Sequence, residues 1–343
     1  MSNRWPGGLI RQTPVIPNGP GQNKAASGVW SLADASYWTK QGLWPTAGVI
    51  ADGTFAIFAL GSTSAGRSAT REKYTYSGGV NSVGGSATVT SCSGSAAGTC
   101  TTGIFALGNT SGGIATTRNK YTYSTCAVGA ATAASAASYQ GSAVGNSTVG
   151  IFSLGLNSAS SRTATRDKYT YSGDTVGAAT AATIASYAQS AAGNSTVGII
   201  AIGDASTGNS VLRNKYTYSG DTVTAGGVAT SASYGGSAAG TATVGIFALS
   251  LASGTPVSTR NKYTYSGDVV SAGGAATQSS SYGSAAGNSV VGIFALGYNS
   301  GFGQLATRNT YTYAGCVVTG ATAATVTNVQ GSAASNGVTG INT

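Results

Sequence analysis

The acidic side chains are the first candidates for chemistry, because the 343-residue sequence contains no histidine. Acid–base catalysis and metal binding both need groups that hold a proton or a cation. The acidic residues are Asp34, Asp52, Glu72, Asp167, Asp174, Asp204, Asp221 and Asp268. Asp174, Asp221 and Asp268 each follow a Tyr-Ser-Gly string, where the equivalent sites hold Gly79, Cys126 and Cys316. Because this repeat position holds aspartate in only half of the copies, we predict that these aspartates form turns. We expect no enzyme activity and no cofactor.

The four cysteines are the second group that could do chemistry. They are Cys92, Cys100, Cys126 and Cys316. The sequence has no CxxC spacing and no histidine, so we expect no metal site. The turns that carry Cys100 and Cys126 should lie about two strand spacings apart, roughly 10 Å, which is too far for a disulfide. We therefore expect free thiols.

A basic and aromatic string, RNKYTY or a close variant, occurs six times. Its arginines are Arg71, Arg118, Arg166, Arg213, Arg260 and Arg308. Three interpretations stay open: the arginines bond strand ends and protect sheet edges, they form a basic ring that meets an acidic partner or polysaccharide, or they bind nucleic acid. The net charge of +9 is dispersed along the chain, which disfavours nucleic acid.

The tyrosine pairs of the same string could stack on sugars or fill a core. In a strand, Arg118 and Lys120 lie on one face, whereas Tyr121 and Tyr123 lie on the other. A tyrosine stripe is typical of a core, since the ring is largely apolar. We expect the tyrosines to pack between adjacent sheets and the basic side chains to cover the opposite surface.

The elements that position these strings form a repeat. The arginines recur at spacings of 47, 48, 47, 47 and 48 residues, and the strings GIFALG and GSAA recur in phase with them. In the third copy the expected strands are 141–146, 148–155, 165–172 and 175–184. Four short antiparallel strands per repeat predict one blade of an all-β propeller. The small GSAA segment suits the innermost strand.

The array over residues 47–343 resembles kelch-type propellers, which combine a small inner strand, a hydrophobic strand ending in glycine and a tyrosine-bearing strand. One glycine usually follows the hydrophobic strand where that family has two, and the outer strand lacks tryptophan. Six full repeats precede the segment 331–343. That segment either closes the ring against the first repeat or begins a seventh blade, and we favour six repeats with C-terminal closure.

The first 46 residues have a different composition. They hold all four tryptophans, Trp5, Trp30, Trp38 and Trp44, and five of the six prolines. Residues 1–28 read as an extended arm, and capping signals predict a short helix over 32–41. Clustered tryptophans are typical anchors of protein interfaces. We predict an N-terminal anchoring domain over 1–46, with the tryptophans docking on a partner.

Residues 25–48, AASGVWSLADASYWTKQGLWPTAG, resemble the start of structural proteins of tailed, marine-type bacteriophages. That resemblance implies a virion component, bound through its arm to other virion proteins or to further copies of itself. No secretory signal and no membrane span are evident, so we expect synthesis in the host cytoplasm. The alternative is a propeller that binds a host surface glycan through loops 109–117 and 298–307.

Overall fold

The structure is a computed structural model that describes residues 53–337. The chain divides into two compact units, Met1–Asp52 and Gly53–Thr343. The first unit lies outside the described residues, and so do the predicted arm, the helix over 32–41 and the four tryptophans. All strands of the described chain belong to the second unit.

Six four-stranded antiparallel sheets make up the body of this unit. The innermost strands are β40 (Ser332–Ser335), β7 (Ser95–Gly98), β14 (Ser142–Gly145), β20 (Ser190–Gly193), β27 (Ala238–Gly240) and β33 (Ser284–Gly287). The second strands are β1 (Phe55–Ala59), β8 (Thr102–Ala106), β15 (Val149–Ser153), β21 (Val197–Ala201), β28 (Val244–Ala248) and β34 (Val291–Ala295). We number these sheets 1 to 6 in that order.

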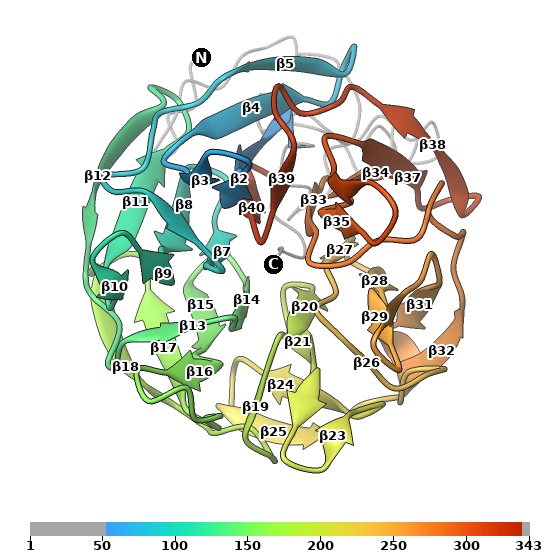
Figure 1. Ribbon diagram of the computed structural model, residues 1–343. Helices are drawn as coiled ribbons and strands as arrows, with labels where there is room; N and C mark the ends of the chain where they lie inside the picture. Colours follow the sequence, from blue (N-terminus) through green and yellow to red (C-terminus); the bar gives the residue numbers. More distant parts are fainter. Residues whose placement is uncertain (1–52, 338–343) are drawn as a thin grey trace, which may run out of the picture. The chain divides into compact units, whose positions relative to one another are not determined.

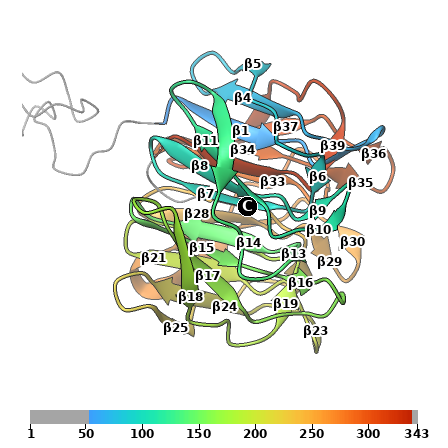
Figure 2. The same cartoon turned by 90° about the vertical axis from the view of Figure 1, so that its left-hand side faces the viewer.

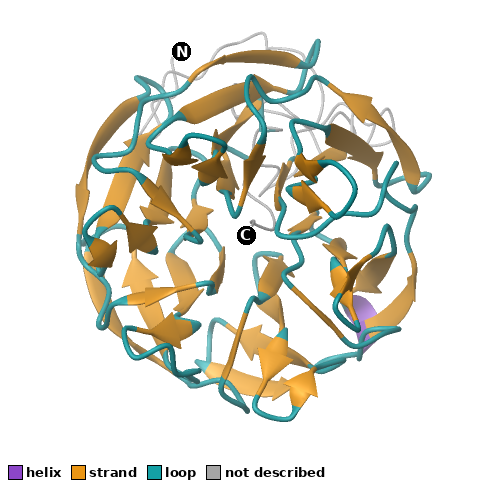
Figure 3. Ribbon diagram, in the orientation of Figure 1, coloured by secondary structure: helices purple, strands orange, loops and turns teal. Residues whose placement is uncertain are grey.

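The third strands carry the basic and aromatic string. They are β4 (Arg71–Thr75), β11 (Arg118–Thr122), β17 (Arg166–Thr170), β24 (Arg213–Thr217), β31 (Arg260–Thr264) and β37 (Arg308–Thr312). The outer strands are β5 (Val80–Val83), β12 (Ala127–Ala131), β18 (Thr175–Ala179), β25 (Thr222–Ala225), β32 (Val269–Ala272) and β38 (Val317–Ala321). One 3-10 helix, η1 (Ser266–Asp268), precedes β32, and strands dominate the rest of the described chain (Figure 3).

The sheets surround a common centre in chain order (Figure 1). The inner strands contact one another in the sequence β40, β7, β14, β20, β27, β33 and again β40. Sheet 1 combines strands from the two ends of the described chain, because β40 pairs with β1 and Ala59 lies opposite Ser332. The C-terminal segment therefore supplies the innermost strand of sheet 1. The arrangement is that of a β-propeller.

Burial explains why these strings form the inner strands. Alanine strands leave room for neighbouring backbones, and a Cβ added to Gly141 would lie only 1.9 Å from the Ser153 carbonyl oxygen. Tyr121 is fully buried in a cluster with Phe105 of its own sheet and Ile57 of sheet 1. The predicted packing of tyrosines between adjacent sheets is thus confirmed.

Short strands form a second layer at one edge of the main sheets, which we call the hairpin face. They are β2 (Ser62–Thr63), β3 (Gly66–Arg67), β6 (Ser91–Cys92), β9 (Asn109–Thr110), β10 (Gly113–Ile114), β13 (Ser138–Tyr139), β16 (Leu156–Asn157), β19 (Ser186–Tyr187), β22 (Asp204–Ala205), β23 (Gly208–Asn209), β26 (Ser233–Tyr234), β29 (Leu251–Ala252), β30 (Thr255–Pro256), β35 (Tyr298–Asn299), β36 (Gly303–Gln304) and β39 (Asn328–Val329). Figure 2 shows this layer on its right-hand side.

The two ends of the described chain lie at the opposite edge. β1 runs toward the hairpin face and β40 runs away from it, as their antiparallel register requires. Gly53, just before β1, is so close to Gly337 that an added Cβ would lie 2.5 Å from the Gly337 nitrogen. We call this edge the chain-end face, and the chain enters the unit there.

Candidate functional site

The six repeated arginines are buried, which corrects the expectation of a basic ring on the surface. Arg71, Arg118, Arg166, Arg213, Arg260 and Arg308 are each only 1% or 2% exposed. The strand alternation was right in placing them opposite the tyrosines, but the next sheet covers that face as well. They are not accessible to an acidic partner or to nucleic acid.

Each arginine instead bonds the residue that follows the arginine of the next sheet. The Nη2-to-oxygen distances are 3.1 Å for Arg71 to Asn119, 2.7 Å for Arg118 to Asp167, 2.9 Å for Arg166 to Asn214, 3.0 Å for Arg213 to Asn261, 3.3 Å for Arg260 to Asn309 and 2.7 Å for Arg308 to Glu72. The last of these links sheet 6 to sheet 1. Buried charge-assisted bonds of this kind hold neighbouring sheets in one geometry.

Aromatic rings cover five of the six guanidinium groups. Arg118 Cζ lies 4.6 Å from the centroid of Phe152, and Arg71, Arg213, Arg260 and Arg308 have equivalent phenylalanines. In sheet 4 the equivalent residue is Ile200. Burial lowers the pKa of Arg71 to about 10, which still leaves the group charged at neutral pH. These arginines are therefore structural cations inside the body.

The three repeated aspartates are turn residues, as predicted. Asp174, Asp221 and Asp268 have φ values of 47°, 48° and 53°, in the left-handed region. The Tyr263 hydroxyl donates to Asp268 at 2.7 Å, and Lys215 lies 2.9 Å from the same carboxylate. Burial acts to raise the pKa of Asp268, but these bonds outweigh it and hold the pKa below its ordinary value.

The cysteines and the other acidic residues of the described chain form no metal-binding cluster. All four cysteines are free thiols, as predicted. Among residues 53–337, no group of three cysteine, aspartate or glutamate side chains is placed to hold a metal ion. Within the same range, no helix is long and apolar enough to cross a bilayer. Glu72 and Asp167, the two fully buried acids of that range, are partners of arginines.

A polar opening lies at the centre of the ring, on the hairpin face. It is a shallow opening, in which the space that water-sized solvent can occupy is about 40 Å³. Two consecutive residues from each repeat line it, just before the inner strand. The pairs are Ser93-Gly94, Gln140-Gly141, Ala188-Gln189, Gly235-Gly236, Tyr282-Gly283 and Gln330-Gly331. We call this feature the axial opening.

A closed cycle of backbone hydrogen bonds surrounds the axial opening. The N–H of the first residue in each pair donates to the carbonyl of its counterpart in the preceding repeat, at 2.8 or 2.9 Å. The donors are Ser93, Gln140, Ala188, Gly235, Tyr282 and Gln330, and the cycle closes from Ser93 to Gln330. The backbone at these six positions is therefore held at fixed points around one axis.

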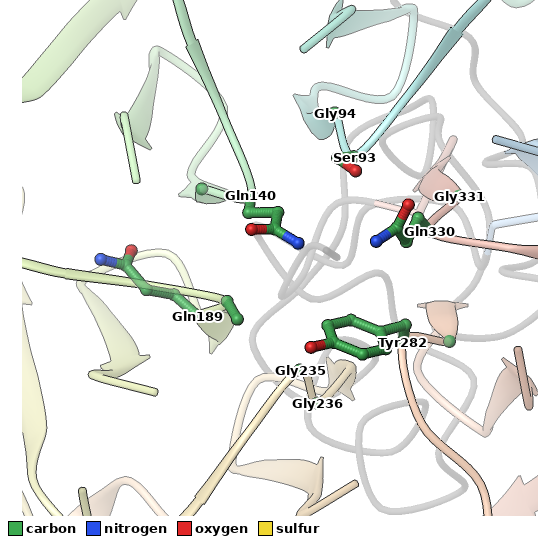
Figure 4. A pocket seen from close by; sticks show the side chains of 12 residues that line it. Ser93, Gly94, Gln140, Gln189, Gly235, Gly236, Tyr282, Gln330 and Gly331 are labelled. Carbon is green, nitrogen blue, oxygen red and sulfur yellow. The ribbon is translucent and has the colours of Figure 1, made fainter. Parts of the chain in front are cut away.

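Three of these side chains reach toward the shared centre. In Figure 4, Gln140, Gln330 and Tyr282 point into the opening, whereas Gln189 points away from it. Gln189 forms internal bonds with Ser186 and Ser142. The Tyr282 ring lies against Gly235, where an added Cβ would be 2.8 Å from ring carbon Cε1. The opening thus joins amide groups on one side with an aromatic ring on the other.

Sequence reasoning missed the axial residues. Gln140, Tyr282 and Gln330 occupy the position just before the glycine of the GSAA string, and that position varies while its neighbours repeat. This variation inside a regular array was the available signal. The loops 109–117 and 298–307, predicted to carry ligand binding, lie on the hairpin face with strands β9, β10, β35 and β36.

The geometry defines a propeller with an axial opening, and comparison with known proteins supports that fold. The solved structure of YjhT, a kelch-like propeller, superposes with a TM-score of 0.55 at 10% sequence identity. The match covers 70% of this chain and 86% of that chain. The sequence matches no family model and no curated relative. At this identity the likeness concerns the fold alone.

Proposed function

We propose that the chain is a six-bladed, kelch-like propeller that serves as a non-enzymatic structural component of a tailed bacteriophage particle. Residues 1–46 anchor it to other particle proteins, and the hairpin face points outward. The observation that carries this proposal is the separation of the two faces. Gly53, the first described residue, lies on the chain-end face, at the opposite edge of the sheets from the hairpin face.

The internal arginine bonds support a mechanical role. A charge-assisted bond joins each sheet to the next, including the junction between Arg308 and Glu72 that links sheet 6 to sheet 1. Removing one partner of the buried Arg308–Glu72 pair leaves a charge without compensation, which costs about 3–5 kcal/mol. At an arginine–asparagine junction, a buried group left without its partner costs about 1–3 kcal/mol. A body with every junction bonded this way suits a part that must keep its shape on a particle surface.

Deletion of residues 1–46 tests the anchoring role. The truncated chain should keep the strand circular dichroism of the intact protein and fail to join particles in an assembly reaction. A full-length Phe302→Ser chain is the matched control, because Phe302 is 79% exposed on a loop of the hairpin face. The control should assemble normally. A folded truncated chain that still assembles contradicts the proposal.

A second function, recognition of a host surface glycan, is favoured by the axial opening. Its three inward side chains are polar or aromatic and lie on the face that the anchored propeller would display. A propeller that presents such an opening serves host attachment as well as assembly. A glycan array probed with the full chain separates the two functions, since a purely structural part binds no glycan selectively.

A further inference from the structure

The axial opening has no charge of its own. None of the twelve described residues that line it is acidic or basic. Arg162 and Asp204, which lie near the neighbouring Tyr187, are paired with each other at 2.9 Å. Burial raises the pKa of Tyr282, so its hydroxyl stays protonated and can donate at neutral pH. The site therefore offers dipoles to a ligand and no net charge.

The axial positions share a left-handed backbone conformation, which eight other non-glycine residues of the described chain also adopt. All six have positive φ, between 50° and 66°, yet only Gly235 is glycine. Glutamine, tyrosine, serine and alanine are strained in this region. The turn residue Asp268 has the same left-handed conformation, and there its side chain accepts a hydrogen bond from Tyr263. At the axis, Gln140 and Gln330 keep non-glycine side chains in that conformation although no hydrogen bond to another described residue holds their amides.

The opening has two chemically different sides. Gln140 and Gln330 direct their amides across it, and each amide can donate and accept at once. Tyr282 supplies an aromatic ring, which meets Tyr234 edge-on with 6.2 Å between centroids. A pyranose matches this pattern, because adjacent hydroxyls pair with amides while its C–H face lies on an aromatic ring.

We propose that the axial opening binds a neutral pyranose unit of a glycan, held by Gln140, Gln330 and Tyr282. The inference deepens the glycan-recognition function given above and rests on it. It does not depend on residues 1–46, so it can fail while the anchoring role stands. It also moves the binding site from loops 109–117 and 298–307 to the axis of the ring.

The absence of charge at the lining residues decides the class of ligand. A carboxylated sugar or a phosphate would leave its charge without a cation among those twelve residues, and the repeated arginines are buried in the sheet junctions. Desolvating an unpaired charge is strongly unfavourable. We therefore expect neutral hexoses and N-acetylhexosamines to bind, and N-acetylneuraminic acid not to bind.

Saturation-transfer NMR on the full chain tests this site. The probes are the methyl glycosides of glucose, galactose, mannose and N-acetylglucosamine, with N-acetylneuraminic acid as the charged comparison. At least one neutral glycoside should give a signal. The double variant Gln140→Gly/Gln330→Gly should weaken its binding at least about tenfold, since two amide contacts are lost. Glycine suits both positions because Gly235 occupies the same one.

Two controls test whether the sugar binds at the axial opening. The Phe302→Ser chain should bind as the wild type does, and intermolecular NOEs from labelled tyrosine should place the sugar at Tyr282 without any substitution. No neutral glycoside binding at a concentration on the order of 10 mM overturns the proposal. So does binding that survives the double glycine variant, binding lost only in Phe302→Ser, or a preference for N-acetylneuraminic acid.

Discussion

A paired substitution between sheets 3 and 4 gives the sharpest test of how the ring packs. Sheet 4 has Ile200 where the other five sheets have phenylalanine, and the facing strand of sheet 3 has Val144 where the others have alanine. A Cβ added to Gly198 would lie 2.5 Å from Val144 Cγ1. At the equivalent Gly150, the ring carbon Cε2 of Phe152 lies 3.1 Å from such a Cβ. The valine methyls therefore occupy the place of the ring edge.

The single variants should each destabilise the protein. Ile200→Phe forces a ring into space that Val144 fills, and overpacking of this kind costs about 1–3 kcal/mol. Val144→Ala removes two buried methyl groups and leaves a gap, which costs about 2 kcal/mol. Both residues are at most 1% exposed, so solvent cannot relieve either defect.

The double variant Val144→Ala/Ile200→Phe should recover most of the loss. The ring then fills the gap and lies over Arg166, adding a cation–π contact of about 0.5–2 kcal/mol. Urea unfolding followed by circular dichroism measures all four chains, and we expect a coupling free energy of at least ~2 kcal/mol. If the loss in the double variant equals the sum of the two single losses, the proposed exchange of volume is wrong.

The reverse exchange is the matched control. At the junction of sheets 4 and 5, Ala192 faces Gly245 beside Phe247. Ala192→Val and Phe247→Ile should each destabilise, and together they should reproduce the arrangement found around Val144. A coupling free energy of the same sign and similar size at both junctions would show that the valine–isoleucine pair and the alanine–phenylalanine pair are interchangeable.

Three further predictions concern the arginine bonds, the axial strain and the tyrosines. Asn214→Ala removes the hydrogen bond from Arg166 and two hydrogen bonds with Thr183. This variant should lower the free energy of unfolding by about 3–5 kcal/mol. A loss below ~1 kcal/mol in urea unfolding would contradict a structural role for these bonds. Gln140→Gly should raise stability by up to about 1 kcal/mol, because relief of the left-handed strain exceeds the added backbone entropy of glycine; a lower melting temperature would show that the glutamine is held internally. Burial raises the pKa of Tyr121, so the unfolded chain loses this proton at a lower pH than the folded chain. The free energy of unfolding should therefore fall as pH rises above about 10. The buried arginines have a lowered pKa, which acts in the opposite direction, but the tyrosines with a raised pKa outnumber them. A urea midpoint that does not fall as the pH rises above about 10 would refute this last expectation.

Local pattern was enough to predict the strands and the aromatic core. The string around Tyr121 alternates with a period of two, and the small segment Ser142–Gly145 suits only a crowded centre. Turn residues such as Asp174 follow from backbone preferences that act within four residues. These features depend on near neighbours in the chain, which is why spacing and composition reveal them.

The environment of the arginines could not be read from the same pattern. Alternation correctly places Arg118 opposite Tyr121, and in a free sheet that face would meet water. In the ring the next sheet covers it, and Asp167 from 49 residues further along the chain supplies the bond. The sequence did contain a trace of this partner, because the residue after each arginine is always asparagine, aspartate or glutamate.

Sequence alone thus determined the repeat, its strands and the tyrosine packing between sheets. Only the tertiary structure decided that the arginines are buried and that Gln140, Tyr282 and Gln330 share one opening. Those three residues are separated by 48 to 190 positions in the chain, and no local rule relates them. They come together because the innermost strands of all six sheets contact one another around a common centre and backbone hydrogen bonds link the axial positions.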